Sequence, residues 1–282
     1  MQYETNKPLI MIRKASGQLE AFNVEKLKAS LKNAGAADEE ITSIVDDISQ
    51  WVYDGLSTKQ IYARAYSNFK RLSKAGASHY KLKTAIMEMG PSGHPFEVFI
   101  GEVFKHWGYT VRTALVMQGA SVTHEMDVLA SKGNELILVE CKFSVKQGNS
   151  VSVQVPLYVH SRVEDIVEKL REEKPYKDSK FVTWIVTNSR FTPDSVQYSR
   201  CKGIQLMGWD HPKSKALKDV IENEKIFPIT VLSSLSKADK TALLADGIVT
   251  CKQIRDSSES IKGLNLSRQK LDSLQKELEA LT

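Results

Sequence analysis

Three polar side chains on two neighbouring segments could hydrolyse a phosphate ester. Asp127 lies in the alternating segment 124–130, and Glu140 and Lys142 lie in the segment 135–143. Both segments are typical of β-strands joined by a tight turn, so we expect a hairpin. Successive side chains of a strand point to opposite faces, and Glu140 and Lys142 therefore share one face of this hairpin.

The expected register of the hairpin places other carboxylates close to Glu140. If Ala130 pairs with Glu135 across the turn, Glu125 lies opposite Glu140, and Asp127 lies diagonally from it on the same face. Diagonal neighbours are about 7–8 Å apart at the backbone, which is within reach of a shared ion. The sequence thus predicts a cluster of carboxylates on one face of the hairpin.

Clustered carboxylates repel one another unless a cation lies between them. Mg²⁺, or Mn²⁺ in its place, prefers oxygen ligands and can be held by one or two carboxylates together with a substrate phosphate. Such an ion can activate water and polarise a phosphodiester, while Lys142 stabilises the charge that develops on the phosphate. The same pattern is also typical of an exposed ion pair on a strand, and spacing alone does not decide between the two. His124 is expected on the opposite face, as a structural residue.

The elements around the hairpin predict an α/β domain with a mixed β-sheet. Helical periodicity is found in residues 96–107, 155–172 and 193–201, and strand-like segments cover residues 110–116, 181–187 and 204–209. Helices that alternate with strands in this way pack on the faces of a sheet. The Gly-Pro-Ser-Gly run at residues 90–93 breaks the chain before this domain.

Residues 91–210 resemble the PD-(D/E)xK nuclease superfamily, and most closely the Mrr-like restriction endonuclease domain. The resemblance is carried by Pro95-Phe96-Glu97, Met126-Asp127-Val128, Val139-Glu140-Cys141-Lys142 and the run from Val186 to Thr192. It implies a restriction-endonuclease-like fold and a metal-dependent nuclease that acts on DNA. The roles it implies are Asp127 and Glu140 as ligands of Mg²⁺ or Mn²⁺, Lys142 as the catalytic lysine, and Glu97 as an auxiliary acid on the first helix. It also implies an assisting polar residue near Gln154.

Residues 10–88 resemble the ATP-cone, a small nucleotide-sensing domain built from a β-hairpin and four helices. The resemblance is carried by Ile12-Arg13-Lys14-Ala15-Ser16-Gly17 and by Phe22-Asn23-Val24-Glu25-Lys26-Leu27. It implies ATP or dATP as an effector, bound through Lys14 and Lys26. Ala15 stands where the family usually has an arginine, so Arg13 would have to replace that arginine from the opposite strand face. A second interpretation is a fold retained for docking or for oligomerisation.

From residue 213 the pattern predicts a helical arm, whose last helix follows Ser267. Residues 235–250 resemble a helix-hairpin-helix unit, in which Gly247 would make the tight turn near a DNA phosphate. Plain helical hairpins also contain such turns, so DNA contact stays open here. We therefore expect three domains, formed by residues 1–90, 91–212 and 213–282.

The composition of the 282 residues, 41% hydrophobic and 26% charged with a net charge of +5, is typical of a soluble globular protein. Three widely spaced cysteines argue against a disulfide framework and against a zinc ribbon. The first residues lack the apolar stretch of a signal peptide, and no apolar run approaches the roughly 20 residues of a membrane span. We expect a cytoplasmic endonuclease without membrane contact, acting as a homodimer if it cuts both strands. The alternatives are a catalytically silent DNA-binding protein and a nucleotide-responsive regulator.

Overall fold

The chain falls into two compact units, residues 1–82 and residues 83–282. The computed structural model describes residues 9–14, 16–33, 36–72, 81–146 and 148–282. The turn residue Ala15 and the expected start of the fourth helix at Ser78 lie outside the described residues. The described part of that helix, α5 (Leu82–Met87), begins at the boundary between the two units.

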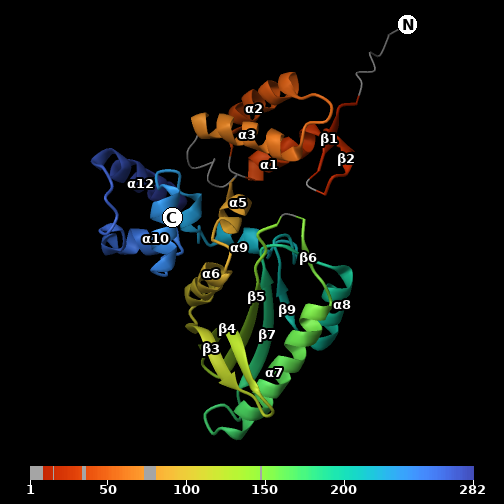
Figure 1. Cartoon of the computed structure of the whole chain (residues 1–282), viewed down its shortest axis with the longest axis vertical. Helices are drawn as coiled ribbons and strands as arrows, with labels where there is room; N and C mark the ends of the chain where they lie inside the picture. The colour runs from red at the N-terminus through yellow and green to blue at the C-terminus, as the bar shows by residue number, and fades with distance from the viewer. Residues whose placement is uncertain (1–8, 15, 34–35, 73–80, 147) are drawn as a thin grey trace. The chain divides into compact units, whose positions relative to one another are not determined.

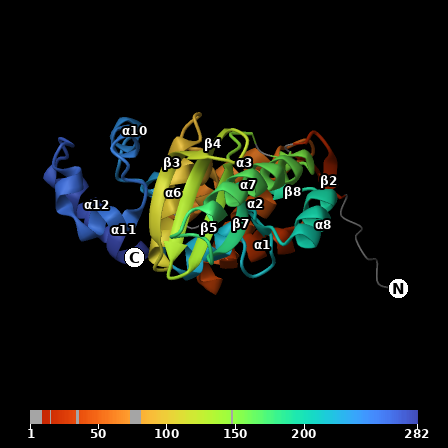
Figure 2. The same cartoon turned by 90° about the horizontal axis from the view of Figure 1, so that it is seen from below.

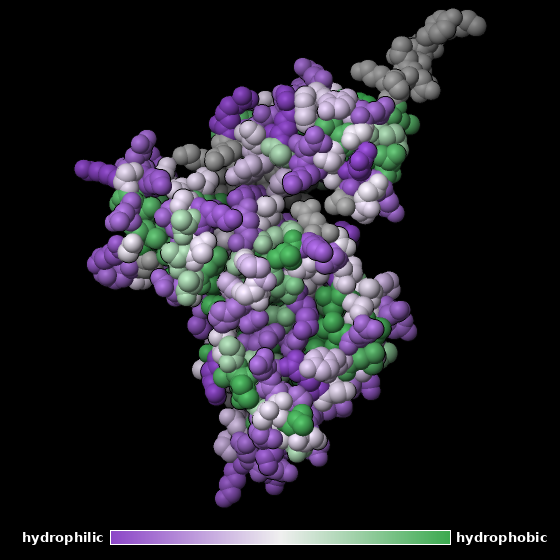
Figure 3. All heavy atoms as spheres, in the orientation of Figure 1, coloured by the Kyte–Doolittle hydropathy of each residue, from purple (hydrophilic) through white to green (hydrophobic). Residues whose placement is uncertain are grey.

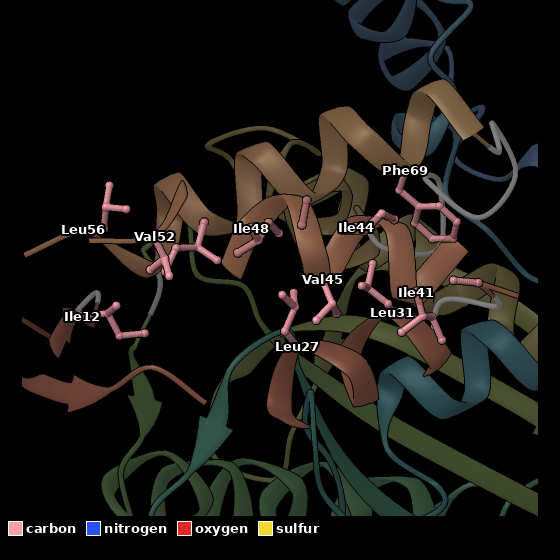
Figure 4. Packing of buried hydrophobic residues seen from close by; sticks show 13 residues of the cluster. Ile12, Leu27, Leu31, Ile41, Ile44, Val45, Ile48, Val52, Leu56 and Phe69 are labelled. Carbon is pink, nitrogen blue, oxygen red and sulfur yellow. The ribbon is translucent and has the colours of Figure 1, made fainter. Parts of the chain in front are cut away.

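The first unit opens with a β-hairpin and continues as helices (Figure 1). β1 (Met11–Arg13) pairs with β2 (Leu19–Ala21), and α1 (Val24–Asn33), α2 (Asp38–Trp51) and α3 (Thr58–Leu72) follow. Apolar side chains that recur at helical spacing on these helices meet in one core, because each helix has an apolar face to bury. Figure 4 shows this core, which contains Leu27, Leu31, Ile41, Ile44, Val45, Ile48 and Phe69.

The second unit is built on a five-stranded mixed sheet, as the sequence predicted. The strands are β3 (Thr110–Gln118), β4 (Thr123–Lys132), β5 (Glu135–Lys142), β7 (Lys180–Thr187) and β9 (Gln205–Met207), in the order β3-β4-β5-β7-β9. β3, β4 and β5 are antiparallel neighbours, and β5, β7 and β9 run parallel. Two short strands, β6 (Ser150–Val151) and β8 (Arg190–Phe191), pair separately.

Helices cover both faces of this sheet (Figures 1 and 2). On one face lies α6 (His94–His106), where the Phe104 ring is 5.6 Å from the Trp184 ring of β7. On the other face lies α7 (Gln154–Glu172), whose apolar residues share a core with Ile185, the next residue of β7. A further helix, α8 (Pro193–Lys202), packs against α7. Successive side chains of β7 thus pack alternately into two hydrophobic layers, one on each face of the sheet.

A distortion in β3 changes which face its side chains share. Val111 and Thr113 contact α6. Leu115 and Met117, which simple alternation would place on the same face, pack instead against the core that contains α7. Between them, Ala114 has a left-handed backbone with φ of 52° and is left out of the β3–β4 pairing. Side chains of residues paired across two strands lie on the same face of the sheet. The reversal in β3 therefore also changes the face of the β4 residues that pair with Leu115 and Met117, namely Met126 and His124.

The β4–β5 hairpin closes with a shorter turn than the sequence suggested. Lys132 pairs with Glu135, so Gly133 and Asn134 alone form the turn, and Gly133 has a φ of 57°. Two-residue hairpin turns need a positive φ, which glycine adopts without strain. The expected pairing of Ala130 with Glu135 was therefore wrong, and the register lies two residues away from it.

The C-terminal segment is helical. Its helices are α9 (Leu217–Asn223), α10 (Lys237–Ala245), α11 (Cys251–Asp256) and α12 (Arg268–Leu281). Ser267 caps α12, as predicted, because its side-chain oxygen accepts the N–H of Lys270. Glu277 of α12 is only 2% exposed, and its carboxylate accepts hydrogen bonds from Ser233 and Ser234. These bonds tie the last helix to the loop before α10.

Hydrophilic side chains cover most of the molecular face in Figure 3, and the hydrophobic ones are interspersed among them. This distribution agrees with a chain in which 26% of the residues are charged. Among the helices that the structure describes, none is long and apolar enough to cross a membrane.

Candidate active site

The predicted catalytic residues line one cleft of about 440 Å³ in the second unit. β4 supplies Asp127, β5 supplies Glu140 and Lys142, and the first turn of α6 supplies Glu97. The remaining lining residues are Thr123, His124, Glu125, Cys141, Tyr158 and Arg162. The fold thus gathers all four residues of the predicted site around one open space.

The corrected hairpin register explains why Asp127 lies so close to Glu140. The pairing between β4 and β5 ends at Val128 and Val139, and its continuation places Asp127, rather than Glu125, across from Glu140. The strands separate at this point, and Asp127 Oδ2 accepts the backbone N–H of Cys141 at 2.6 Å. A side-chain carboxylate has replaced a backbone carbonyl as the partner of this N–H.

Glu140 is buried and lies between two cations. Only 3% of the residue is exposed. Its Oε1 accepts a hydrogen bond from Lys142 Nζ at 2.6 Å, and its Oε2 accepts one from Arg162 Nη1 at 2.8 Å. A buried carboxylate needs such partners, because charge taken out of water is costly unless it is paired and hydrogen-bonded.

The sequence analysis missed Arg162, although the sequence carried a signal for it. Arg162 is 8% exposed and lies on the buried face of α7, among Val159, Val163 and Ile166. A charged residue inside an apolar helical stripe is expensive to bury without a partner, so it points to a buried opposite charge. The partner, Glu140, lies on a strand that only the folded chain brings close.

Asp127 has a strongly perturbed acidity. Burial, followed by the nearby negative charge of Glu140, raises the pKa of Asp127 from its ordinary value of 3.8 to about 6. The hydrogen bond from Cys141 opposes this change. The two carboxylates therefore differ, since Glu140 is paired with two cations while Asp127 bears a charge that the protein stabilises poorly. Perturbed acidity in a cleft is typical of functional sites.

His124 lies in the cleft, not on the opposite face as expected, because of the distortion at Ala114. Its Nε2 lies 2.7 Å from Asp165 Oδ2 of α7. Asp165 also accepts the backbone N–H groups of Ser121 and Val122, in the turn between β3 and β4. The hydrogen bond of His124 is the main cause that lowers the pKa of Asp165 to about 2. His124 and Asp165 thus fix the wall of the cleft against α7.

Polar residues at the end of β7 and just after it hold the end of β5 in place. Thr187 Oγ1 donates to the carbonyl oxygen of Lys142 at 2.5 Å. Asn188 is 3% exposed and binds the backbone of Ser144 in both directions, accepting its N–H and donating to its carbonyl, each at 2.8 Å. The backbone is therefore fixed at Lys142 and two residues beyond it, which limits where the ammonium of Lys142 can reach.

The donor set of the cleft fits a single hard divalent cation. Among the described residues, no group of three His, Cys, Asp or Glu side chains forms a ready-made metal cage. Two neighbouring carboxylates, Asp127 and Glu140, nevertheless suffice for Mg²⁺ or Mn²⁺, which retain several waters. The lining contributes four carboxylates, Glu97, Glu125, Asp127 and Glu140, against two cations, so a divalent ion would offset the excess negative charge.

The first turns of α7 contain Gln154, where an assisting polar residue was expected, and Tyr158. Gln154 is the first residue of α7 and is exposed, and the lining of the cleft does not include it. Tyr158 lines the cleft and is 59% exposed. Its ring lies 5.1 Å from the guanidinium carbon of Arg162, one helical turn further on.

In the first unit, two of the three predicted nucleotide-binding residues converge on Glu20. Lys14 Nζ lies 2.6 Å from one oxygen of this carboxylate, and Lys26 Nζ lies 3.0 Å from the other. The hydrogen bonds of the two lysines lower the pKa of Glu20. Arg13 is exposed on β1. A nucleotide phosphate would therefore have to compete with Glu20 for the two lysines.

A larger cavity, of about 640 Å³, lies elsewhere in the second unit. It is lined by Lys105 and His106 of α6 and by C-terminal residues that include Thr250 and Lys252. Its charges are mixed, and it lacks the Asp, Glu and Lys arrangement on paired strands. The smaller cleft is the candidate active site, because it contains the residues that the sequence analysis predicted for phosphodiester hydrolysis.

Comparison with known proteins identifies the sheet domain. Residues 89–211 match the restriction endonuclease family model, which covers all four predicted catalytic residues, and residues 227–282 match the family described as AF1548-like, C-terminal. An uncharacterized protein of Archaeoglobus fulgidus is 28% identical over 176 residues, which cover 61% of this chain and 92% of the relative. The chain therefore contains a restriction endonuclease-like domain, followed by a segment shared with AF1548-like proteins.

One solved structure agrees with this fold. The protein of unknown function AF1548 matches with a TM-score of 0.54 and 23% identity, over 67% of this chain and 97% of that one. The MspJI restriction endonuclease in complex with a 27-mer oligonucleotide matches with a TM-score of 0.35 and 16% identity, over 72% of this chain and 40% of that one. The second similarity is too weak to inform the account of the fold or the site.

Proposed function

We propose that the chain is a metal-dependent DNA endonuclease that hydrolyses phosphodiester bonds in the cleft between β4, β5 and α6. The observation that carries this proposal is the placement of Asp127, Glu140 and Lys142 together in one open cleft. The restriction endonuclease match of residues 89–211 supports nuclease activity independently of that geometry. The proposed catalytic domain spans residues 91–212.

Each residue has a role in the proposed reaction. Asp127 and Glu140 would hold Mg²⁺ or Mn²⁺, which supplies Lewis acidity and a more acidic water when bound. Lys142, which is partly exposed, would direct its ammonium at the phosphate and stabilise the negative charge that develops there. Glu97 would act as an auxiliary acid from the first turn of α6.

The test is a plasmid-cutting assay with purified protein and Mg²⁺ or Mn²⁺. Replacing Asp127, Glu140 or Lys142 by alanine should each abolish cutting while the far-UV circular dichroism spectrum is retained. Glu164→Gln is the matched control, because Glu164 is exposed on α7 and its side chain is 68% accessible. Cutting by the alanine variants at the wild-type rate would refute the assignment. Binding of DNA without metal-dependent cutting by the wild type would favour the silent DNA-binding alternative.

We also propose that the N-terminal domain, residues 1–90, binds ATP or dATP as an effector of cutting. The convergence of Lys14 and Lys26 on the hairpin supports this role, and Arg13 would add a third cation. Titration calorimetry with ATP and dATP on wild type and on Lys26→Met would test binding, and cutting with and without nucleotide would test regulation. Equal heats from the two proteins would contradict the assignment of Lys26.

The C-terminal arm, residues 213–282, is proposed to contact DNA without reading its sequence. The turn between α10 and α11 supports this idea, because Gly247 adopts a φ of 75° there and leaves the backbone open to a phosphate. A gel shift at several salt concentrations with Lys252→Ala would test the contact. Light scattering with and without DNA would test the proposed homodimer.

A further inference from the structure

Arg162 is a buried cation whose position is explained by one carboxylate. Its side chain is 10% exposed, and its Nη1 donates to Glu140 Oε2 at 2.8 Å. Its guanidinium also lies 5.1 Å from the centre of the Tyr158 ring, on the same helix. A guanidinium is planar and always charged, so it holds its partner in a fixed geometry. Arg162 is therefore built into the wall of the cleft.

Lys142 and Arg162, the two cations bound to Glu140, differ in how easily another cation could displace them. Lys142 has a side chain that is 39% exposed and reaches Oε1 with a flexible stem, whereas Arg162 reaches Oε2 from within the core of α7. An ammonium near solvent can exchange with another cation at little cost. Displacing Arg162 would leave a buried guanidinium without its partner, and the free-energy cost of such an unpaired charge is far higher.

Asp127 lies beside the replaceable cation. Among the described residues, no ion pair is formed by Asp127, although Glu140, across from it, has two. A divalent cation between the two carboxylates would thus contact Asp127, which has no counter-ion among the described residues. It would also contact Glu140, whose Oε1 is bound by the exchangeable Lys142. Lys142 would then be free to turn towards a substrate phosphate.

We propose that Arg162 is a permanent counter-ion of Glu140 and stays bound to Oε2 when a divalent cation binds. The cation then replaces Lys142 at Oε1, and the cleft admits one ion. This inference rests on the proposed function of the cleft as a metal site. It makes Arg162 a positioning residue, and it sets Lys142 and the metal ion in competition for the same oxygen.

The experiment is a titration of the full chain with Mn²⁺, followed by electron paramagnetic resonance of the free ion. Wild type should bind one Mn²⁺ per chain. Arg162→Met, which keeps the bulk and removes the charge, should bind Mn²⁺ about tenfold more tightly or better, because a neighbouring positive charge no longer repels the ion. Arg171→Met is the matched control, since Arg171 is exposed on the same helix and lies 5.2 Å from the centre of the Phe181 ring.

Lys142→Met provides a second variant that does not depend on the folding of Arg162→Met. It should also bind Mn²⁺ more tightly than wild type, because the competing ammonium is gone. Two ions per wild-type chain, or an affinity in Arg162→Met that equals or falls below that of wild type, would overturn the role of Arg162. A wild type that neither binds Mn²⁺ nor cuts DNA would overturn the proposed function as well.

Discussion

Replacing Asp127 by asparagine should stabilise the metal-free protein near neutral pH. Asp127 is held where its charged form is disfavoured, since burial and the charge of Glu140 raise its pKa to about 6. An asparagine keeps a side-chain oxygen that can accept the N–H of Cys141 and removes the charge. Asp127, which is proposed for catalysis, therefore lowers the stability of the fold, as residues of functional sites commonly do.

The size of this effect follows from the change in acidity. The difference between the Asp127 pKa of about 6 and its ordinary value of 3.8 corresponds to a free energy of about 3 kcal/mol before solvent screening is considered. Because the cleft is open to solvent, we expect about 1–2 kcal/mol of this to be measurable. The folded-state pKa lies above the unfolded one, so the penalty is absent below about pH 4, grows between pH 4 and 6, and is complete above pH 6. The gain from Asp127→Asn should follow the same course.

Urea denaturation in EDTA at pH 5 and pH 7.5 measures this gain. Asp165→Asn is the matched control with the opposite sign, because the pKa of Asp165 is lowered to about 2 by its hydrogen bonds. That variant should lose stability at both values of pH. When Mn²⁺ replaces EDTA in the buffer, the ion should stabilise wild type but not Asp127→Asn. If Asp127→Asn were no more stable than wild type at pH 7.5, with an unchanged dependence on urea, the electrostatic account of the cleft would be wrong.

Three further changes test other parts of the structure. Gly119→Ala should lower the melting temperature, because the added Cβ would lie 2.0 Å from an oxygen of Asp165, whereas Gly263→Ala meets nothing within 4 Å and should leave it unchanged. Glu20→Gln should tighten ATP binding several-fold in titration calorimetry by releasing two lysines, and weaker binding would contradict the proposed nucleotide site. Phe104→Ala should lower the free energy of unfolding by about 3–5 kcal/mol in urea denaturation, because the ring of this α6 residue is fully buried against β7. A loss below about 1 kcal/mol would contradict this expectation and show that the core closes around the gap.

The sequence predicted the strands of the site well, because their alternation is a direct consequence of backbone geometry. Glu140 and Lys142 share a face, as expected, and their side chains are hydrogen-bonded to each other. The register was wrong by two residues, since alternation has a period of two and fits both registers equally. The tight turn at Gly133 decided between them, and it brought Asp127 across from Glu140.

Other features of the cleft depend on contacts that one segment cannot reveal. The left-handed backbone of Ala114 turns His124 towards α7, and alanine gives no local signal for such a conformation. Arg162 did interrupt an apolar stripe, but its partner lies on a strand from a different part of the chain. The pairing of Lys14 and Lys26 with Glu20 likewise required the hairpin and the helix to be placed together.

The most direct test of the central claim compares metal binding and DNA cutting in Lys142→Met. The account predicts that this variant binds Mn²⁺ more tightly than wild type. It should nevertheless convert supercoiled plasmid to nicked or linear DNA about 100-fold more slowly, because an electrostatic contact to the reacting phosphate is lost. Wild-type cutting by Lys142→Met, or loss of metal binding together with cutting, would contradict the separate roles assigned to the carboxylates and the lysine.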